Sequence, residues 1–282
     1  CIKEPKHWNR GAHSVFFRAY MARHSATGEP EIVEKLRKHY LSGTSPHTEY
    51  REANNIEIML WVYEKTGDKR LLKHAEQAYE GFNRNHAEVD ETVENMLSSR
   101  KGTDHGVSYC ELAKLGAILY KYTGKKRWLD ATRNAFRKLE RDQLLIDGVN
   151  SSTEALRGKD PLDSHETCDV TDYTWALGYL LEITGDAHYA DGIERAIFNA
   201  TPGSVRNDFK AVQYFSCPNQ VLATENSNHN LFHRGIEWMS YRPRPGTQCC
   251  PAQINRTAPN YLSRMWLTNT RQGLVAAMYG PS

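Results

Sequence analysis

The stretch EIMLWVYEKTGDKRLLKHAEQAYEGF, residues 57–82, indicates the fold class of this chain. Apolar residues recur at three- and four-residue spacing on both sides of a central Thr-Gly pair, which is the pattern of two amphipathic helices. Glycine suits the left-handed turn that ends a helix. The same arrangement recurs at residues 16–40, 111–139 and 173–200, so the sequence predicts four helical hairpins.

The distances between the Thr-Gly pairs indicate how these hairpins are arranged. Thr27, Thr66, Thr123 and Thr184 are separated by 39, 57 and 61 residues, which is too irregular for a solenoid of uniform repeats. Hairpins that each bury one face must stack or close around a shared axis. We therefore expect an all-α fold, a toroid of α/α hairpins with its active site among the long loops at one end.

The composition excludes two classes of partner. The chain carries 36 Lys and Arg against 34 Asp and Glu, a net charge of +2, and no run of one sign forms a phosphate-binding face, so nucleic acid is not an expected partner. No apolar stretch approaches the roughly 18 residues that a membrane span needs. The hydrophobic fraction of 39% suffices for a sizeable core.

Two long irregular segments, residues 142–168 and 200–250, each end at cysteines where a helix begins. In the first segment, HETC places Glu166 two residues before Cys168. Residues two apart share a face in an extended chain and not in a helix. If both side chains point the same way, the helix begins near Asp169.

The second segment ends with two adjacent cysteines. Cys249 and Cys250 precede Pro251, and proline is favoured at the first helical position, so Cys250 is expected to cap a helix whose dipole favours a thiolate. Three thiols and one carboxylate match the number of ligands that tetrahedral zinc takes. Two other interpretations stay open: cysteines that pack as small hydrophobes, and a strained vicinal disulfide.

Three motifs carry a resemblance to a known family. HETC, the helix pair ITGDAHYADGIERAIFNA and the segment QCCPAQINR resemble glycoside hydrolase family 127 and its DUF1680 relatives, which include β-L-arabinofuranosidases. The resemblance implies an (α/α)6 barrel followed by β-sandwich domains. Residues 1–268 would be the catalytic barrel without its N-terminal part, and residues 269–282 the first strand of a truncated β-sandwich domain. The missing β domains could then provide the interface of a homo-oligomer.

The resemblance also implies a catalytic site. Glu166, Cys168, Cys249 and Cys250 match the family's zinc ligands, Cys249 matches its nucleophile, and Glu154 stands where the family has its acid/base glutamate. The implied activity is that of a retaining glycosidase acting on L-arabinofuranosides or related plant or bacterial glycans, with Zn2+ as cofactor and a carbohydrate as substrate.

Further residues are candidates for substrate binding. His105 and Tyr214 match pocket residues of the family. His233 lies in a long loop that could line a sugar pocket, although a structural hydrogen bond is equally compatible, and Trp238 is the better placed tryptophan for stacking on a sugar. His165 adjoins a supposed ligand and is either a supporting residue of the metal site or a solvated loop histidine.

Two rival functions fit the same residues. The first is a zinc enzyme that alkylates a thiol on an α/α toroid, whose site would usually include a histidine ligand and lack the acid/base glutamate. The second is a non-catalytic carbohydrate-binding relative in which zinc only stabilises the fold.

Overall fold

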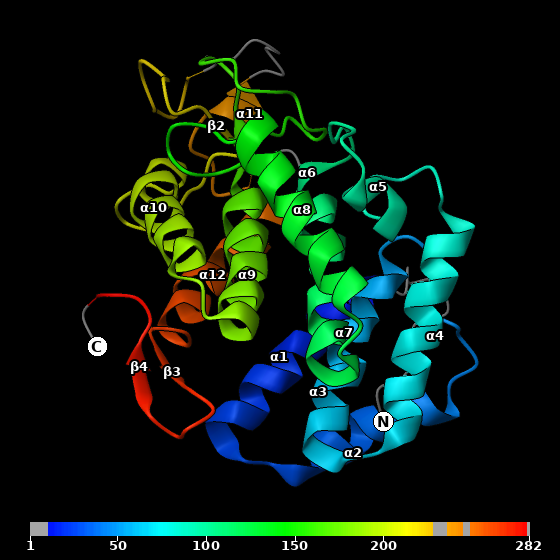
Figure 1. Cartoon of the computed structure of the whole chain (residues 1–282). Coiled ribbons are helices and arrows are strands. Elements are labelled where there is room, and N and C mark those ends of the chain that lie inside the picture. The colour runs from blue at the N-terminus through cyan, green and yellow to red at the C-terminus, as the bar shows by residue number, and fades with distance from the viewer. Residues whose placement is uncertain (1–10, 228–235, 245–248, 281–282) are drawn as a thin grey trace. The chain divides into compact units, whose positions relative to one another are not determined.

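The computed structural model describes residues 11–227, 236–244 and 249–280 (Figure 1). The chain divides into two compact units: unit 1 comprises Cys1–Ser98 and Leu115–Thr132, and unit 2 comprises Ser99–Lys114 and Arg133–Ser282. The described elements are α1 (Gly11–Thr27), α2 (Pro30–Ser42), η1 (Glu52–Asn54), α3 (Asn55–Thr66), α4 (Lys69–Asn85), α5 (Val93–Leu97), α6 (Gly106–Ala113), α7 (Leu115–Thr123), α8 (Lys126–Asp142), β1 (His165–Glu166), α9 (Thr167–Thr184), α10 (Ala187–Ser204), β2 (Phe215–Ser216), α11 (Ile236–Met239), α12 (Cys249–Leu262), β3 (Trp266–Thr268) and β4 (Leu274–Ala276).

The four Thr-Gly turns share one construction, which confirms the predicted hairpins. Each threonine is the last residue of its helix, and each following glycine has a φ between 67° and 70°. The threonine hydroxyl donates to the carbonyl four residues earlier at 2.6–2.9 Å. The same oxygen accepts the backbone N–H two residues later at 3.2–3.3 Å. One hydroxyl therefore closes one helix and positions the start of the next.

Unit 1 is built from α1 to α5 and α7, with the first turns of α8. Its core runs along α3, where Ile56, Ile58 and Leu60 are fully buried. An ion pair is also buried there: Arg18 Nη2 lies 2.8 Å from Glu57 Oε2. Burial of two charges is tolerated when they are paired and hydrogen-bonded, so this part of α3 is polar as well as apolar.

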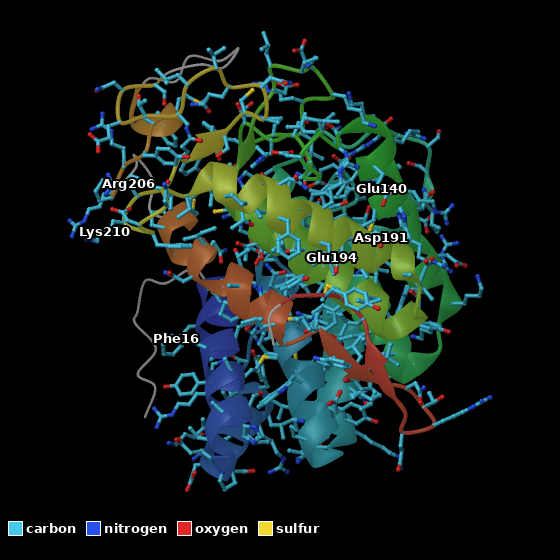
Figure 2. The ribbon with its side chains drawn as sticks, turned by 90° about the vertical axis from the view of Figure 1, so that its left-hand side faces the viewer. Phe16, Glu140, Asp191, Glu194, Arg206 and Lys210 are labelled. Carbon is cyan, nitrogen blue, oxygen red and sulfur yellow. The ribbon has the colours of Figure 1, made fainter. Side chains whose placement is uncertain are left out.

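Unit 2 is organised around α9. This helix packs against α6, α10 and α12, and α9 and α10 lie side by side in Figure 1. Thr171 of α9 and Thr257 of α12 share a hydrogen bond of 2.6 Å between their hydroxyls. Glu194 of α10, labelled in Figure 2, accepts the backbone N–H of Tyr279 at 2.7 Å. These contacts join α9 to α12, and α10 to the segment after β4.

Two short antiparallel ribbons complete unit 2. β1 pairs with β2, with His165 opposite Ser216 and Glu166 opposite Phe215. β3 pairs with β4 near the end of the described chain. Strand β4 falls within residues 269–282, and its assignment to a β-sandwich domain stays a prediction. In the described part of the chain, no helix is both long and apolar enough to cross a membrane.

Candidate metal centre and active site

The predicted ligands come together at two helix starts in unit 2. Glu166, Cys168, Cys249 and Cys250 each offer one ligand atom, and these four atoms all lie within 4.8 Å of one another. The Sγ atoms of Cys168 and Cys250 are 3.3 Å apart. Both of these cysteines and Glu166 are buried, whereas Cys249 is half-buried. The described cysteines are free thiols, so no vicinal disulfide joins Cys249 to Cys250.

The first pair of candidate ligands is placed by the start of α9. Glu166 has extended φ and ψ and is the residue before the helix, while Cys168 lies within the first turn. The expectation that the helix begins near Asp169 is therefore wrong by two residues. Asp169 explains the difference, because its carboxylate accepts the backbone N–H of Glu166 at 3.2 Å and so supports an earlier first turn.

The second pair is placed by the start of α12, which begins at Cys249. Both cysteines therefore belong to the first turn, instead of Cys250 standing before it as a cap. Helix N-termini favour negative charge, so the starts of α9 and α12 both favour ionised ligands. The cluster is then a set of anionic groups facing two positive helix ends.

The donor set fits a divalent metal of the zinc type. Glu166 is 1% exposed, and its carboxylate lies within 4.8 Å of the three thiol sulfurs and 3.4 Å from His105 Nε2. A buried carboxylate is costly unless it is paired, and a divalent cation would pair it together with the neighbouring thiolates. Thiolates and a carboxylate are ligands of tetrahedral zinc, at about 2.3 Å for sulfur and about 2.0–2.2 Å for oxygen.

The pKa values of the three thiols are shifted in different directions. Hydrogen bonds from Cys168 and Cys250 hold the pKa of the Cys249 thiol well below its usual range, although burial opposes this shift. The pKa of Cys168 is raised, first by its hydrogen bonds to Cys249 and Cys250 and then by burial. Burial is the main cause of the raised pKa of Cys250. Negative charge in the cluster therefore accumulates on Cys249, the predicted nucleophile.

Glu154 lies beside this cluster, as expected of the acid/base residue. Its carboxylate contacts His105 Nε2 at 3.3 Å and accepts a hydrogen bond from the Tyr214 hydroxyl at 2.9 Å. The Tyr214 hydroxyl in turn accepts from Cys249 Sγ at 3.5 Å. The structure thus brings His105 and Tyr214 together with the predicted acid/base and the predicted nucleophile.

The backbone at Glu154 is left-handed, with a φ of 75°. Two donors hold its carbonyl oxygen: the backbone N–H of Gly106 at 2.9 Å and the Ser152 hydroxyl at 2.8 Å. A Cβ on Gly106 would come within 2.6 Å of Ser152 Cβ, so this approach requires glycine. The loop therefore rests on the start of α6 and turns the Glu154 side chain toward the cluster.

His105 is a hydrogen-bond donor to the carboxylates and not a metal ligand. Its Nε2 lies near both Glu154 and Glu166, at 3.3 and 3.4 Å, and these three residues also satisfy a distance criterion for metal binding. However, His105 precedes α6, and its Nδ1 accepts the backbone N–H of Ser108 at 3.2 Å. An accepting Nδ1 leaves the proton of a neutral imidazole on Nε2. Burial lowers the pKa of His105, but the contacts with the two carboxylates raise it by more and so keep a proton on Nε2.

Of the two remaining candidates for substrate binding, the structure describes Trp238 but not His233. The Trp238 ring makes an edge contact with Tyr214, with 4.6 Å between ring centroids, and stacks on Phe215 at 5.8 Å. Trp238 therefore supports the Tyr214 ring, and its stacking on a sugar stays a prediction. His233 lies outside the residues that the structure describes.

Two hydrogen-bonded pairs beside the site were not predicted as pairs from the sequence. His165 is fully buried, and its Nε2 lies 2.8 Å from Asp147 Oδ2, so it is not a solvated loop histidine. Asn150 Nδ2 donates to Asp169 Oδ1 at 3.1 Å. The three-residue spacing from Glu166 to Asp169 is a usable signal, because an acid at that position reaches back to the preceding N–H. Nothing in the sequence pairs Asp147 with His165.

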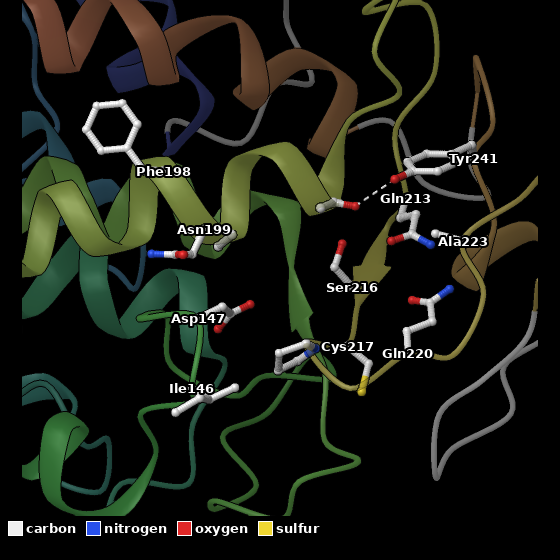
Figure 3. Close-up of a pocket in the computed structure, with 13 residues that line it drawn as sticks. Ile146, Asp147, Phe198, Asn199, Gln213, Ser216, Cys217, Gln220, Ala223 and Tyr241 are labelled. Atoms are coloured by element: carbon white, nitrogen blue, oxygen red, sulfur yellow. Dashed lines mark hydrogen bonds between the residues drawn. The ribbon is translucent and has the colours of Figure 1, made fainter. Parts of the chain in front are cut away.

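A cavity of about 500 Å³ lies next to the His165–Asp147 pair (Figure 3). Asp147 and Ser216 line it, whereas Phe215 packs against Cys168 and Cys250. Successive residues of a strand point to opposite faces, so the β1–β2 ribbon separates the cavity from the metal-ligand cluster. The His165–Asp147 pair anchors β1 from the side away from the cluster.

Comparisons with known proteins place this geometry in a family. Residues 23–263 match the family model described as the β-L-arabinofuranosidase GH127 catalytic domain. No curated protein matches the chain. A solved structure titled glycoside hydrolase superposes with a TM-score of 0.77 at 17% identity, covering 96% of this chain and 49% of that chain.

Two solved GH127 enzymes are also similar. A β-arabinofuranosidase has a TM-score of 0.70 at 18% identity, covering 90% of this chain and 40% of its own. A β-L-arabinofuranosidase from Geobacillus stearothermophilus T6 has a TM-score of 0.70 at 17% identity, covering 95% and 49%. This chain therefore spans half or less of the length of these three proteins. The likeness confirms the expected fold class, an all-α fold of the α/α-toroid type. The match over residues 23–263 shows that this chain belongs to the GH127 catalytic-domain family.

Proposed function

We propose that this chain carries the catalytic site of a retaining glycoside hydrolase in which Cys249 is the nucleophile and Glu154 the acid/base. The observation that carries the proposal is that the Tyr214 hydroxyl contacts both groups, at 3.5 Å from the thiol and 2.9 Å from the carboxylate. A double displacement needs a nucleophile and a proton donor on the same bound sugar. Contact of both candidates with one hydroxyl supports their action on a single bound sugar.

Glu166, Cys168, Cys249 and Cys250 would hold the zinc ion. A bound zinc ion keeps a coordinating thiol deprotonated at neutral pH. The remaining ligands orient the Cys249 sulfur, since Cys168 and Cys250 contact it from the first turns of two helices. The half-buried position of Cys249 leaves its sulfur accessible to a substrate, whereas the other two thiols are buried.

In the first displacement, the Cys249 sulfur uses its electron pair to form a bond to the anomeric carbon. The bond from that carbon to the leaving oxygen breaks, and Glu154 gives its proton to this oxygen. In the second displacement, a water oxygen attacks the same carbon, the C–S bond breaks with its electrons returning to sulfur, and Glu154 takes a proton from the water. Two inversions retain the configuration of the sugar.

The proposed substrate class is the L-arabinofuranosides or related glycans. Two of the similar solved structures bear titles that name them β-arabinofuranosidases, and the matched family model has the same description. The buried aromatic support around Tyr214 and the half-exposed Glu154 carboxylate suit an open pocket for a sugar. A carbohydrate is therefore the proposed partner of this site.

The experiment that tests the proposal is covalent trapping. Incubation with a panel of p-nitrophenyl furanosides and pyranosides, followed by peptide mass spectrometry, should identify a glycosyl adduct on Cys249. Glu154→Gln should keep its metal, measured by elemental analysis, and lose turnover by a factor of about 10²–10⁴. Cys217→Ser changes a buried cysteine outside the cluster and serves as the matched control, with turnover retained.

The rival functions give different results in the same experiment. A thiol-alkylating zinc enzyme would form no glycosyl adduct, and its metal site would usually include a histidine, which the donor role of His105 argues against. A non-catalytic relative would bind sugars without turnover of any substrate in the panel. An adduct on a residue other than Cys249 would contradict the proposed mechanism.

A further inference from the structure

The position of the Tyr214 hydroxyl is set by packing and not by its polar partners. Tyr214 is 2% exposed, and its ring makes edge contacts with Phe215 and Trp238 at centroid distances of 4.8 and 4.6 Å. Its backbone N–H also donates to the carbonyl oxygen of Trp238 at 3.1 Å. The hydroxyl is therefore a fixed point between Cys249 and Glu154.

A phenol hydroxyl has a single hydrogen to donate, so Tyr214 can serve either the sulfur or the carboxylate, but not both. In the structure this hydrogen goes to the Glu154 carboxylate at 2.9 Å, and the phenol oxygen lies 3.5 Å from Cys249 Sγ. While Glu154 is in place, the phenol hydrogen is therefore withheld from the sulfur.

We infer that Tyr214 is a positioning residue whose single hydroxyl links Cys249 to Glu154, with its hydrogen donated to the Glu154 carboxylate and its oxygen facing the sulfur. This inference rests on the proposed function for its catalytic meaning. The hydrogen-bond link itself depends only on the three side chains. Tyr214 thus has a role in the reaction apart from any contact with the sugar.

The link can be tested through the reactivity of Cys249 in the protein with its native metal content. The rate of Cys249 alkylation by iodoacetamide is measured by peptide mass spectrometry in the wild type, Tyr214→Phe, Glu154→Gly and the double variant. Glycine is chosen at position 154 because its left-handed backbone accepts it without strain. Phenylalanine keeps the aromatic contacts and removes only the hydroxyl.

Removing Glu154 frees the phenol hydrogen for the sulfur, which makes the sulfur less reactive only when Tyr214 is present. We therefore expect the effect of Glu154→Gly on the alkylation rate to differ by about ten-fold between the wild-type and Tyr214→Phe backgrounds, as for a hydrogen bond to a charged group. Equal effects in both backgrounds would overturn the link. Tyr241→Phe is the control, because its hydroxyl donates to Gly203 away from the site, and it should show no coupling to Glu154→Gly.

If Cys249 reacts in none of the four proteins, the free energies of unfolding of the same four proteins are measured in urea. Additive losses of stability in the two single variants would equally overturn the link. Kinetics then separate the link from the proposed function. A positioning role predicts that Tyr214→Phe lowers kcat, whereas a residue that only binds the sugar would raise KM with kcat unchanged. Ten-fold coupling in a protein that hydrolyses no glycoside would leave the link standing and overturn the glycosidase proposal.

Discussion

At the scale of single residues, the main feature is the left-handed backbone of Glu154. Non-glycine residues in this conformation are costly and need support from their surroundings. Gly106 and Ser152 supply that support through the Glu154 carbonyl oxygen. The sequence could suggest Glu154 as the acid/base through its resemblance to the family, but not its backbone, because Gly106 becomes a neighbour of Glu154 only after folding.

This strain predicts an unusual order of variant stabilities. Glu154→Gly should unfold at higher urea than Glu154→Ala, with a difference of about 1–2 kcal/mol, because only glycine accepts the left-handed conformation freely. Both variants remove the same carboxylate. Glu34, an exposed residue of helix α2, is the control: there alanine should be more stable than glycine by about 1 kcal/mol. If the alanine and glycine variants had the same order of stability at both positions, the strain at Glu154 would be contradicted.

A second prediction at this scale concerns the support behind β1. Asp147→Ala removes the partner of His165, whose Nδ1 lies 3.2 Å from the backbone carbonyl oxygen of the proposed ligand Glu166. The variant should therefore weaken zinc binding by about ten-fold. Competition with a chromophoric chelator measures the affinity. Asp208→Ala removes an exposed partner of Arg206 and should leave it unchanged. Equal affinity in Asp147→Ala and wild type would show that the pair does not support the site.

At the scale of elements, the four Thr-Gly turns show why the hairpins could be predicted from sequence. All of their contacts lie within a few residues, so the same local sequence gives the same local structure. The starts of α9 and α12 were predicted less well, by about two residues each. Their position depends on Asp169 and on packing between distant segments, which local patterns do not contain.

The turn construction predicts the effect of a single methyl group. A Cβ on Gly67 would meet nothing within 4 Å, yet its φ is 67°, so Gly67→Ala should destabilise the protein by about 1–2 kcal/mol through the backbone alone. Gly203→Ala is the matched control, because its Cβ also meets nothing but it lies within helix α10. Alanine there should stabilise by up to about 1 kcal/mol. Thermal unfolding of both variants tests the contrast.

At the scale of the molecule, the metal-ligand cluster joins segments that are far apart in sequence. The residue types and the family resemblance were enough to predict its four members. The Asp147–His165 pair, by contrast, could not be predicted, because neither residue type nor spacing distinguishes it from a solvated pair. What the sequence carries poorly is therefore the support of the cluster and not the identity of its four members.

The cluster predicts that stability depends on metal. An ion that binds only the folded state at 1,000 times its Kd stabilises that state by about 4 kcal/mol, so a chelator should lower the melting temperature and added zinc should restore it. Cys250→Ser should be less stable than wild type and insensitive to the chelator. Cys217→Ser should keep the response. If the chelator left the melting temperature of the wild type unchanged, a metal that stabilises the fold would be contradicted.

The separation of the ligands along the chain also sets an order of events during synthesis. Cys168 and Cys250 lie 82 residues apart, whereas each Thr-Gly turn is closed by neighbours. As the polypeptide leaves the ribosome, hairpins can therefore form one after another. Glu166 and Cys168 are translated before Cys249 and Cys250, so the cluster cannot form until α12 has been made. For the proposed zinc site, loading of the ion would be a late step of maturation, and a nascent chain halted before α12 would carry only two of the four proposed ligands.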